Sequence, residues 1–326
     1  MEYRTLGTAN FKVSCLALGG NIFGHFCEAQ ETAEIMAEAQ NLGINFVDTA
    51  DVYSEGRSEE YIGNAIRGCR KDWVVATKAG VRSGEYPGGI GRKECIQQCL
   101  DASLNRLQTD YIDLYQMHYF DPETPLDETL ETLNGLVQQG KIRSFGASNY
   151  SGEKLQEAHQ IAQLQNWKSF TSTQNSYNLF RREIESDVLP AVKELGIGAI
   201  IYGSLARGIL SGKYRLGQVP PPESRGLASS SINADLNTTV LETIENLTAF
   251  AGERGQTLLS LAFAWLLRQD PVSTLLVGVR NIAQLRANVG AIGWKLSSAE
   301  VAEIDRIVGD LQRFEAYCLG QFPNWL

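Results

Sequence analysis

The feature that most constrains the fold of this chain is a repeat: a short apolar segment followed by a helical pattern. The apolar segments lack polar alternation, which is typical of strands covered on both faces in a parallel sheet. Eight such repeats favour an α/β fold with a closed (β/α)8 TIM barrel over an open, doubly wound sheet. A short N-terminal β-hairpin precedes the first repeat. The predicted strands are Cys15–Leu18, Ile44–Val47, Trp73–Ala76, Tyr111–Gln116, Ile142–Gly146, Phe170–Thr173, Ile197–Ile201 and Thr274–Val277.

Amphipathic helical patterns separate these strands and close the chain. One polar stretch, Ser211–Ala234, interrupts the repeat and is predicted to be a loop, of a length that is usually functional or disordered. The barrel needs the elements on both sides of this loop, so we expect one domain over residues 1–326, with a C-terminal tail. The predicted helices are Glu31–Asn41, Glu59–Arg67, Arg92–Arg106, Leu126–Gln139, Gly152–Leu164, Ser186–Leu195, Leu236–Gly252, Thr257–Arg268, Ile282–Gly290 and Ser298–Leu311.

Length and composition agree with one large barrel in a soluble protein. Barrels of this kind typically take about 250 residues and more with insertions, and this chain has 326. Its net charge of −9 argues against a broad nucleic-acid-binding face, which would have to be basic. A run of about 18 apolar residues, the signature of a membrane span, is absent from the sequence. The N-terminus also lacks the apolar core of a signal peptide.

The cysteines do not predict disulfides or a metal site. No C-x-x-C pair occurs, and six cysteines in so long a chain are no disulfide framework. Cys95 and Cys99 lie one helical turn apart without a nearby histidine, which favours a buried, inert pair over metal ligands. We therefore expect no metal and a reducing, cytoplasmic environment. The six are Cys15, Cys27, Cys69, Cys95, Cys99 and Cys318.

Polar residues follow seven of the predicted strands. In a barrel the carboxyl ends of the strands meet at one mouth, where enzymes of this fold carry their chemistry. One polar residue at a strand end arises easily by chance, but a whole ring of them at one mouth does not. The sequence therefore predicts a site built from these positions. They are Asp48, Lys78, His118, Ser148 with Asn149, Gln174 with Asn175, Tyr202, and Gly278 with Arg280.

Asp48, Lys78 and His118, together with Tyr53, supply what carbonyl reduction requires. A carbonyl that accepts a hydride needs a proton donor at its oxygen. A free tyrosine, with a pKa of about 10, is a poor acid near neutrality, and a lysine ammonium beside it lowers that pKa. An aspartate can hold and neutralise the lysine. A neutral histidine can hydrogen-bond the substrate oxygen and orient it.

Each of these residues also has an ordinary structural explanation. An aspartate before a threonine, as in Asp48-Thr49, often caps a helix or a turn. A single lysine after a strand is usually solvated, and a single histidine such as His118 more often makes a structural hydrogen bond. We expect that structural role for His159, within a helix, and leave both roles open for His25 in the first barrel loop. The case for a site therefore rests on joint placement.

The same segments resemble the aldo-keto reductase superfamily over nearly the whole chain. The strongest match is the stretch GINFVDTADVYSEG at residues 43–56, followed by Ser58, Glu59 and Gly63, which resembles the family segment carrying the aspartate and the tyrosine. Taken together, the motifs are highly specific, although each alone is only moderately so. The other similar segments are Val75–Lys78, Tyr111–His118, Gly146–Tyr150, Thr173–Asn178, Tyr202–Gly208, Leu210–Lys213 and Val277–Asn288.

The resemblance implies a carbonyl oxidoreductase with assigned roles. Tyr53 would be the general acid in reduction and the base in oxidation. Lys78 and Asp48 would tune it, and His118 would orient the carbonyl. Tyr202 would stack on the nicotinamide ring. The other cofactor contacts implied are Ser148, Asn149 and Gln174 for the carboxamide, and Gly203, Ser204, Leu205, Gly208, Lys213, Gly278, Arg280, Gln284 and Asn288 for the rest of the dinucleotide.

The cofactor implied by the resemblance is NADPH. Neither a G-x-G-x-x-G after a strand nor a G-x-x-x-x-G-K-[ST] occurs, and aldo-keto reductases bind their dinucleotide at the barrel mouth without either motif. Arg280 could pair with a 2′-phosphate through its guanidinium fork, just before a helix whose N-terminus favours an anion. The chain departs from some members at Gly278–Val279, where they have Lys-Ser, and from many at Ala287, where they have Glu. The pattern with Arg280 resembles the bacterial-type branches.

Two other functions remain open. A nucleotide-sensing regulatory subunit, like the potassium-channel beta subunits that share the barrel and the tetrad, would bind NADPH with little turnover. Nothing in the sequence resembles an extra interaction domain, and the N-terminal arm is too short for one. An unrelated barrel enzyme that converged on these residue types is disfavoured by the contiguous motifs. We expect no nucleic-acid or membrane partner, and the resemblance is compatible with a monomer or a larger assembly.

The substrate is expected to be a small carbonyl compound. The pocket walls would come from the loops Asn21–Cys27 and Tyr119–Pro122 and from the C-terminal tail. Aromatic lining suits an apolar or ring-bearing compound, although about half of such residues would merely pack the loops. Sugar, pyridoxal and secondary-metabolite substrates all stay open. The candidates are Phe23, His25, Phe26, Tyr119, Phe120, Phe322 and Trp325.

Overall fold

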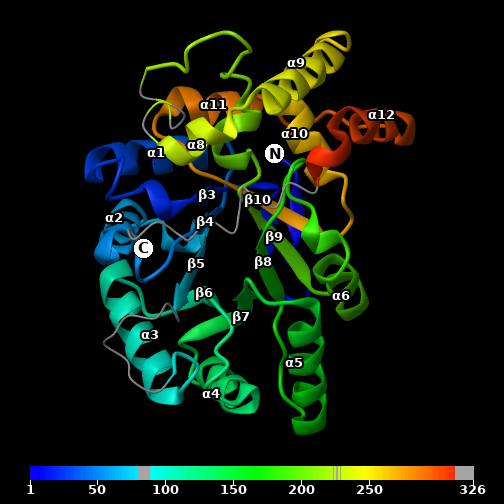
Figure 1. Cartoon of the computed structure of the whole chain (residues 1–326). Coiled ribbons are helices and arrows are strands. Elements are labelled where there is room, and N and C mark those ends of the chain that lie inside the picture. Colours follow the sequence, from blue (N-terminus) through cyan, green and yellow to red (C-terminus); the bar gives the residue numbers. More distant parts are fainter. Residues whose placement is uncertain (80–88, 223, 225–226, 228, 313–326) are drawn as a thin grey trace.

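A closed ring of eight parallel strands forms the centre of the structure (Figure 1), which confirms the predicted (β/α)8 barrel. This computed structural model describes residues 1–79, 89–222, 224, 227 and 229–312. Each strand pairs with the next one along the chain, and the last pairs with the first, so the ring is closed without a free edge. The strands are β3 (Leu16–Gly19), β4 (Phe46–Asp48), β5 (Val74–Ala79), β6 (Ile112–Met117), β7 (Ile142–Ser148), β8 (Ser172–Ser176), β9 (Gly198–Tyr202) and β10 (Val272–Val277).

Helices cover the outside of the ring (Figure 1). In α4, for example, Leu126, Leu130 and Leu133 recur every three or four residues and form the buried stripe that packs on the barrel. Side-chain caps begin several helices, as where Ser151 accepts a hydrogen bond from the Lys154 amide. The helices are α1 (Ala29–Asn41), α2 (Arg57–Ala65), α3 (Lys93–Leu107), α4 (Leu126–Gln138), α5 (Gly152–Gln165), α6 (Val188–Leu195), α8 (Ser230–Asp235), α9 (Thr238–Gly252), α10 (Leu258–Leu267), α11 (Ile282–Gly290) and α12 (Ser298–Val308).

The predicted N-terminal hairpin closes the end of the barrel where the strands begin. Its strands β1 (Tyr3–Thr5) and β2 (Lys12–Ser14) pair antiparallel. Leu6 and Val13 pack in one buried cluster with interior side chains of several barrel strands. Gly7 is required there, because a Cβ on it would lie 2.1 Å from the Thr171 carbonyl oxygen. The hairpin thus plugs this end and leaves the opposite end for a site.

The structure corrects several predicted boundaries. β5, β7 and β8 continue through Lys78, Ser148 and Gln174, which were predicted to follow their strands, and Asp48 and Tyr202 are the last residues of β4 and β9. These polar side chains continue the strands because partners inside the barrel mouth satisfy them. The short helix α8 overlaps the end of the stretch predicted to be a loop. Phe322, Trp325 and Cys318 lie outside the described residues.

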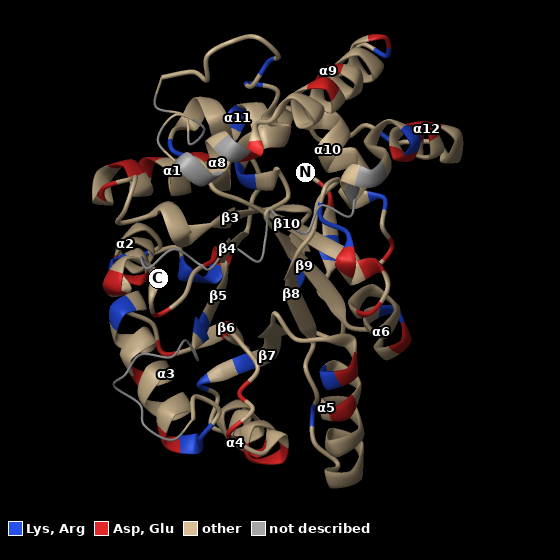
Figure 2. Ribbon diagram, in the orientation of Figure 1, with Lys and Arg blue, Asp and Glu red and all other residues tan. Residues whose placement is uncertain are grey.

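Charged side chains of both signs are interspersed along outer helices such as α5 and α12 (Figure 2). In the described part of the chain, no helix is both long and apolar enough to cross a membrane.

Candidate active site

Three strands and one turn bring the predicted tetrad together at the mouth where the strands end. Asp48 ends β4, Lys78 lies near the end of β5, and His118 follows β6 directly. Tyr53 begins a short 3₁₀ turn, Tyr53–Gly56, five residues after the end of β4. Because β4, β5 and β6 are neighbours in the ring, their three side chains share one side of the mouth.

The Lys78 ammonium is the centre of this group. It is fully buried and donates to Asp48 Oδ2 at 2.6 Å and to the Thr49 carbonyl oxygen at 2.8 Å. Its third interaction is with the Tyr53 hydroxyl, 3.4 Å away. The ammonium has three donors, so each is used, and one of them points at the phenol oxygen.

Two glutamines hold the second oxygen of Asp48. The side-chain amides of Gln116 and Gln174 donate to Asp48 Oδ1 at 3.0 Å and 2.8 Å. Together with Lys78 they satisfy a carboxylate that is only 2% exposed, as a buried charge requires. Gln116 was not predicted as a site residue. Its signal was a polar residue inside the apolar run of β6, two positions before His118 and therefore on the same face of the strand.

His118 lies against the phenol as a neutral imidazole. Its ring centroid is 5.9 Å from that of Tyr53, in an edge-on arrangement. Burial and the nearby Lys78 charge lower the pKa of His118 well below its usual value. Its Nδ1 is buried and finds no hydrogen-bond partner within the described residues. A neutral imidazole in this position can share a hydrogen bond with a substrate oxygen without competing for a proton.

The environment acts on the Tyr53 hydroxyl in two directions. Burial, and then the carboxylates of Asp48 and Asp51, raise its pKa. The Lys78 ammonium opposes them, because it is 3.4 Å from the hydroxyl and stabilises the phenolate. Tyr53 is therefore protonated before the reaction, and the Lys78 ammonium can stabilise the phenolate that forms when the proton leaves. This arrangement suits proton donation.

The turn that carries Tyr53 has a strained backbone. Ser54 and Glu55 have φ values of 52° and 59°, in the left-handed region that costs about 1–2 kcal/mol per non-glycine residue. Gly56 follows at φ 87°. The Ser54 hydroxyl donates to the Phe23 carbonyl oxygen at 2.9 Å and so ties the turn to the first barrel loop. Such strain persists only where surrounding contacts enforce it, as at functional sites.

The residues predicted to hold the carboxamide lie beside the tetrad. Asn149 donates to the His118 carbonyl oxygen at 3.1 Å and accepts from the Tyr202 hydroxyl at 2.8 Å. Ser148 donates to the Gln174 carbonyl oxygen at 3.1 Å. Thus β7, β8 and β9 present one hydrogen-bonded group of amides and hydroxyls, next to the strands that carry the tetrad.

Two further groups predicted to contact the dinucleotide flank the mouth. After β9, the loop at Gly203–Lys213 turns sharply, with Gly203 at φ 66° and Gly208 at φ 97°. A Cβ on Gly208 would lie 3.0 Å from the Lys213 Nζ, so the ammonium sits directly against the turn. Ser204 is buried and donates to the Leu276 carbonyl oxygen at 3.4 Å. Leu205, also in this loop, is partly buried against the core.

After β10, the second group surrounds the start of α11. The Gln284 side chain accepts from the Arg280 amide at 2.9 Å, and the Arg280 guanidinium lies 4.0 Å from the ring centre of Phe26. Asn281, not predicted, caps the helix by accepting from the Gln284 amide at 2.9 Å. Gly278 is exposed, and Asn288 is buried in α11. The cations Lys213 and Arg280 therefore stand on the two loops that follow β9 and β10.

The predicted substrate-facing residues differ in what they offer. Tyr119 stacks on His118 with ring centroids 5.2 Å apart, and Phe120 packs edge-on against Tyr150 at 5.5 Å. His25 is exposed and packs edge-on against Phe26 at 4.2 Å. Phe23 has no exposed area and belongs to the main hydrophobic core. Tyr119 is therefore the aromatic residue that lies against the tetrad, whereas Phe120 packs toward α5, and Phe23 supports its loop.

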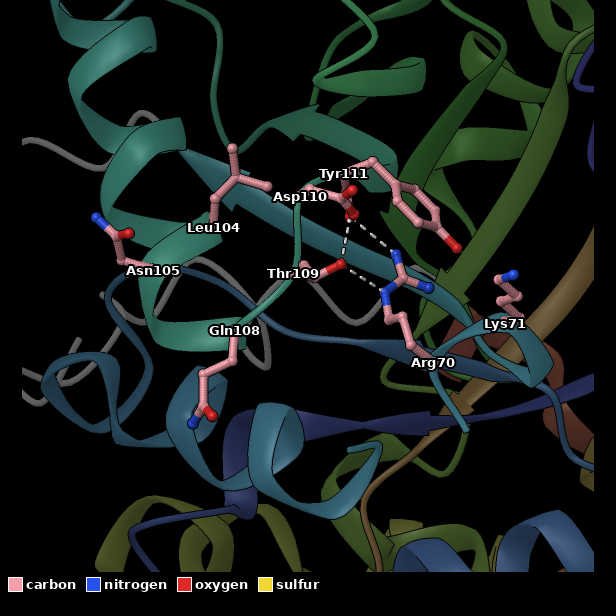
Figure 3. A pocket seen from close by; sticks show the side chains of 8 residues that line it. All are labelled: Arg70, Lys71, Leu104, Asn105, Gln108, Thr109, Asp110 and Tyr111. Carbon is pink, nitrogen blue, oxygen red and sulfur yellow. Dashed lines mark hydrogen bonds between the residues drawn. The ribbon is translucent and has the colours of Figure 1, made fainter. Parts of the chain in front are cut away.

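An open groove of about 560 Å³ lies away from this site, where β5 and β6 begin (Figure 3). Its floor is an Arg70 side chain that donates to the Thr109 hydroxyl at 3.1 Å and to the Tyr111 carbonyl oxygen at 3.0 Å. Among the residues that the structure describes, no three His, Cys, Asp or Glu side chains are grouped to hold a metal. The lining residues are Arg70, Lys71, Leu104, Asn105, Gln108, Thr109, Asp110 and Tyr111.

Comparison with known proteins places the chain in a family that agrees with the barrel. The model of the aldo/keto reductase family matches residues 15–308. A probable aldo-keto reductase of Glycine max is 33% identical over 309 residues, which cover 92% of this chain and 86% of the relative. An aldo-keto reductase of Bacillus subtilis is 33% identical over 318 residues, 94% of each chain. A probable voltage-gated potassium channel subunit beta of Arabidopsis thaliana is 34% identical over 301 residues, covering 90% of this chain and 91% of the relative.

The chain belongs to the aldo/keto reductase family, as predicted. Membership of this family supports an activity in the oxidoreduction of small-molecule carbonyl compounds, for which the family generally uses a nicotinamide dinucleotide.

Proposed function

We propose that this protein reduces an aldehyde or ketone to an alcohol with NADPH, and that Tyr53 donates the proton. The observation that carries the proposal is the Lys78 ammonium, held by Asp48 at 2.6 Å and directed to the Tyr53 hydroxyl at 3.4 Å. The bound nicotinamide would supply the hydride. The protein's own part is to hold the substrate oxygen and deliver a proton to it.

The proposed steps use only groups at the mouth. Neutral His118 hydrogen-bonds the carbonyl oxygen and orients it toward Tyr53. As negative charge develops on this oxygen, the Tyr53 hydroxyl transfers its proton to it. The Lys78 ammonium then stabilises the phenolate, and Asp48 keeps the ammonium in place. In alcohol oxidation the same groups would act in reverse, with Tyr53 as the base.

The chain offers suitable groups for the dinucleotide. Asn149, Ser148 and Gln174 would supply amides and a hydroxyl for the carboxamide, and Tyr202 would stack on the ring. Gln174 now donates to Asp48, so the carboxamide would share or replace this bond. Lys213 and Arg280 are cations on adjacent loops, suited to phosphates. Arg280, at the start of α11, supports a preference for the 2′-phosphate of NADPH.

The proposed substrate class rests on the aromatic residues predicted to line the pocket, of which Tyr119 lies against His118. Tyr119 and Phe120 would contact the body of the substrate, and His25 and Phe26 would stand further out, which suits an apolar or ring-bearing carbonyl compound. The five described cysteines, including the buried Cys95 and Cys99, form no disulfide with one another. Thiols outside disulfides support a reducing compartment such as the cytoplasm.

A second candidate, a nucleotide-sensing regulatory subunit, is favoured by the name of the Arabidopsis relative. One experiment separates the two functions: cofactor consumption measured with a panel of aldehydes, including nitrobenzaldehyde and methylglyoxal, with NADPH and NADH in parallel. We expect turnover with NADPH and much less with NADH. Tight NADPH binding without turnover of any aldehyde would overturn the enzyme proposal and favour the sensor. Equal use of NADH would overturn only the cofactor preference.

A further inference from the structure

A third carboxyl group lies beside the tetrad and has no part in the steps above. Asp51 is two residues before Tyr53, and its amide donates to the Lys78 carbonyl oxygen at 3.2 Å. It is therefore attached by its backbone to the strand that carries the catalytic ammonium. Its Oδ1 is buried and has no hydrogen-bond partner in the part of the chain that the structure describes. A buried carboxylate oxygen left in this way is costly when charged.

The charged groups around Asp51 are already paired with one another. From β4 and β5, Asp48 and Lys78 form an ion pair at 2.6 Å. From α2 and α3, Glu59 and Arg106 form a second pair at 2.6 Å, and Glu59 also accepts from the Thr77 hydroxyl at 2.5 Å. Among the described residues this cluster thus has three carboxyl groups and two cations, and Asp51 is the carboxyl without a cation of its own.

The remaining titratable groups that face Asp51 carry no positive charge. They are the Tyr53 hydroxyl from the 3₁₀ turn, the Cys95 and Cys99 thiols from α3, and the Tyr115 hydroxyl from β6. Burial first, and then the Glu59 carboxylate, raise the pKa of Asp51 to about 7, against the weaker effects of Arg106 and of hydrogen bonds from the Cys99 thiol and the Val52 amide. Asp51 therefore exchanges its proton near neutrality.

Ionised Asp51 acts directly on the proposed acid. Its negative charge raises the pKa of Tyr53, after the larger effects of burial and Asp48. When Tyr53 gives up its proton, the resulting phenolate would then lie near the Asp51 carboxylate, which has no cation of its own. Protonated Asp51 removes that repulsion, and the Lys78 ammonium, 3.4 Å from the Tyr53 hydroxyl, still stabilises the phenolate.

We propose that Asp51 is a positioning residue for the proposed reduction: protonated, it allows Tyr53 to release its proton, and ionised, it opposes that release. The inference rests on the proposed function. It gives the sign of a pH dependence, because carbonyl reduction should weaken as the pH rises through the ionisation of Asp51.

The test is the pH profile of kcat/KM for aldehyde reduction in the wild type and in Asp51→Asn. One pKa unit on Tyr53 is a tenfold change in its acidity. Because only part of this is expressed in the rate, we expect the wild type to lose about three- to tenfold between about pH 6 and about pH 8. Asp51→Asn, which mimics the protonated carboxyl, should show no such fall and should exceed the wild type at the upper end.

A matched control and a second measurement keep the test decisive. Asp110→Asn, in the groove at the other end of the barrel, should keep the wild-type profile. A purely structural role of Asp51 would lower kcat/KM at every pH without moving the inflection, and that outcome would overturn the proposal. Should Asp51→Asn not fold, carbon-13 NMR of wild-type aspartate carboxyls, with the resonance assigned through Asp51→Glu, should show a titration near the stated pKa. Its titration in the ordinary range of aspartates would overturn the proposal.

Failure of the inference and failure of the proposed function look different. If the wild type turns over aldehydes but the Asp51→Asn profile keeps the inflection, only the role of Asp51 is wrong. If the wild type turns over no aldehyde at any pH, the proposed function is wrong and the role of Asp51 in reduction is wrong with it.

Discussion

Two aspartates in this barrel are equally buried and differ in what holds them. Asp48 is 2% exposed at the end of β4, and Asp113 is 1% exposed near the start of β6, toward the opposite end of the barrel. Asp48 is paired with one lysine. Asp113 bridges two arginines, with Oδ1 2.7 Å from Arg143 Nη1 and Oδ2 2.8 Å from Arg70 Nη2, and also accepts from the Val75 amide at 3.0 Å.

The two aspartates differ in the hydrogen-bond partners of their cations, Arg70 and Lys78. Three other donors of Arg70 go to the Trp73 and Tyr111 carbonyl oxygens and to the Thr109 hydroxyl. Arginine also keeps its proton at any ordinary pH. Lys78, in contrast, presents one donor to a titratable phenol. The two buried aspartates thus have different roles: the Asp113 cluster fixes the chain entering two strands, whereas in the proposed function the Asp48–Lys78 pair prepares a proton transfer.

Removing a phenol hydroxyl should produce the largest difference in turnover between a substitution at the barrel mouth and the same substitution at the opposite end of the barrel. Tyr53→Phe should lower turnover by about 10²–10⁴-fold, the usual contribution of a positioned general acid, while NADPH binding is kept. Steady-state kinetics and cofactor titration by fluorescence measure the two quantities. Tyr111→Phe, the same change beside Arg70, should leave turnover unaltered. Near-normal turnover in Tyr53→Phe would show that another group donates the proton.

Removing the cation should give the next largest effect. Lys78→Met should lower kcat by about 10²–10³-fold, because a preorganised electrostatic donor beside the phenol is lost. It should also reduce the free energy of unfolding by about 3–5 kcal/mol, since Asp48 is left buried without its partner. Lys71→Met, in the groove, serves as the matched control and should change neither quantity appreciably. Normal kcat in Lys78→Met would refute the part assigned to the ammonium.

The tetrad could be predicted because its geometry is encoded in strand ends. Asp48, Lys78 and His118 each stand where an apolar run stops, and the parallel barrel turns this sequence position into a shared location. The exact ends of the strands could not be predicted in the same way. Lys78, Ser148 and Gln174 are polar and therefore seemed to end their strands, but partners across the barrel mouth satisfy them and the strands continue.

The residues that sequence reasoning missed are those whose partners come from distant parts of the chain. Gln116 reaches Asp48 across 68 positions. Asp113 meets arginines that precede β5 and follow the start of β7, and nothing in its local sequence indicates two partners. The unpaired charge of Asp51 can be recognised only from the structure, which shows that the nearby cations Lys78 and Arg106 are already paired with other carboxylates. Such properties depend on which charges the fold brings together.

Neutralising Asp113 should lower the free energy of unfolding while leaving turnover almost unchanged, the smallest effect on turnover among these substitutions. Asp113→Asn leaves Arg70 and Arg143 without their shared carboxylate, and we expect a loss of about 1–3 kcal/mol in the free energy of unfolding. The barrel mouth is at the other end, so kcat of the folded enzyme should stay near the wild-type value. Urea unfolding and steady-state kinetics on the same preparations measure both. Asp48→Asn is the matched comparison and should lower kcat strongly. The fall in kcat of Asp113→Asn can be compared with the fraction of the protein that is unfolded in the same preparation. If kcat falls by more than that fraction, the two ends of the barrel are energetically coupled, and the two buried aspartates are not independent.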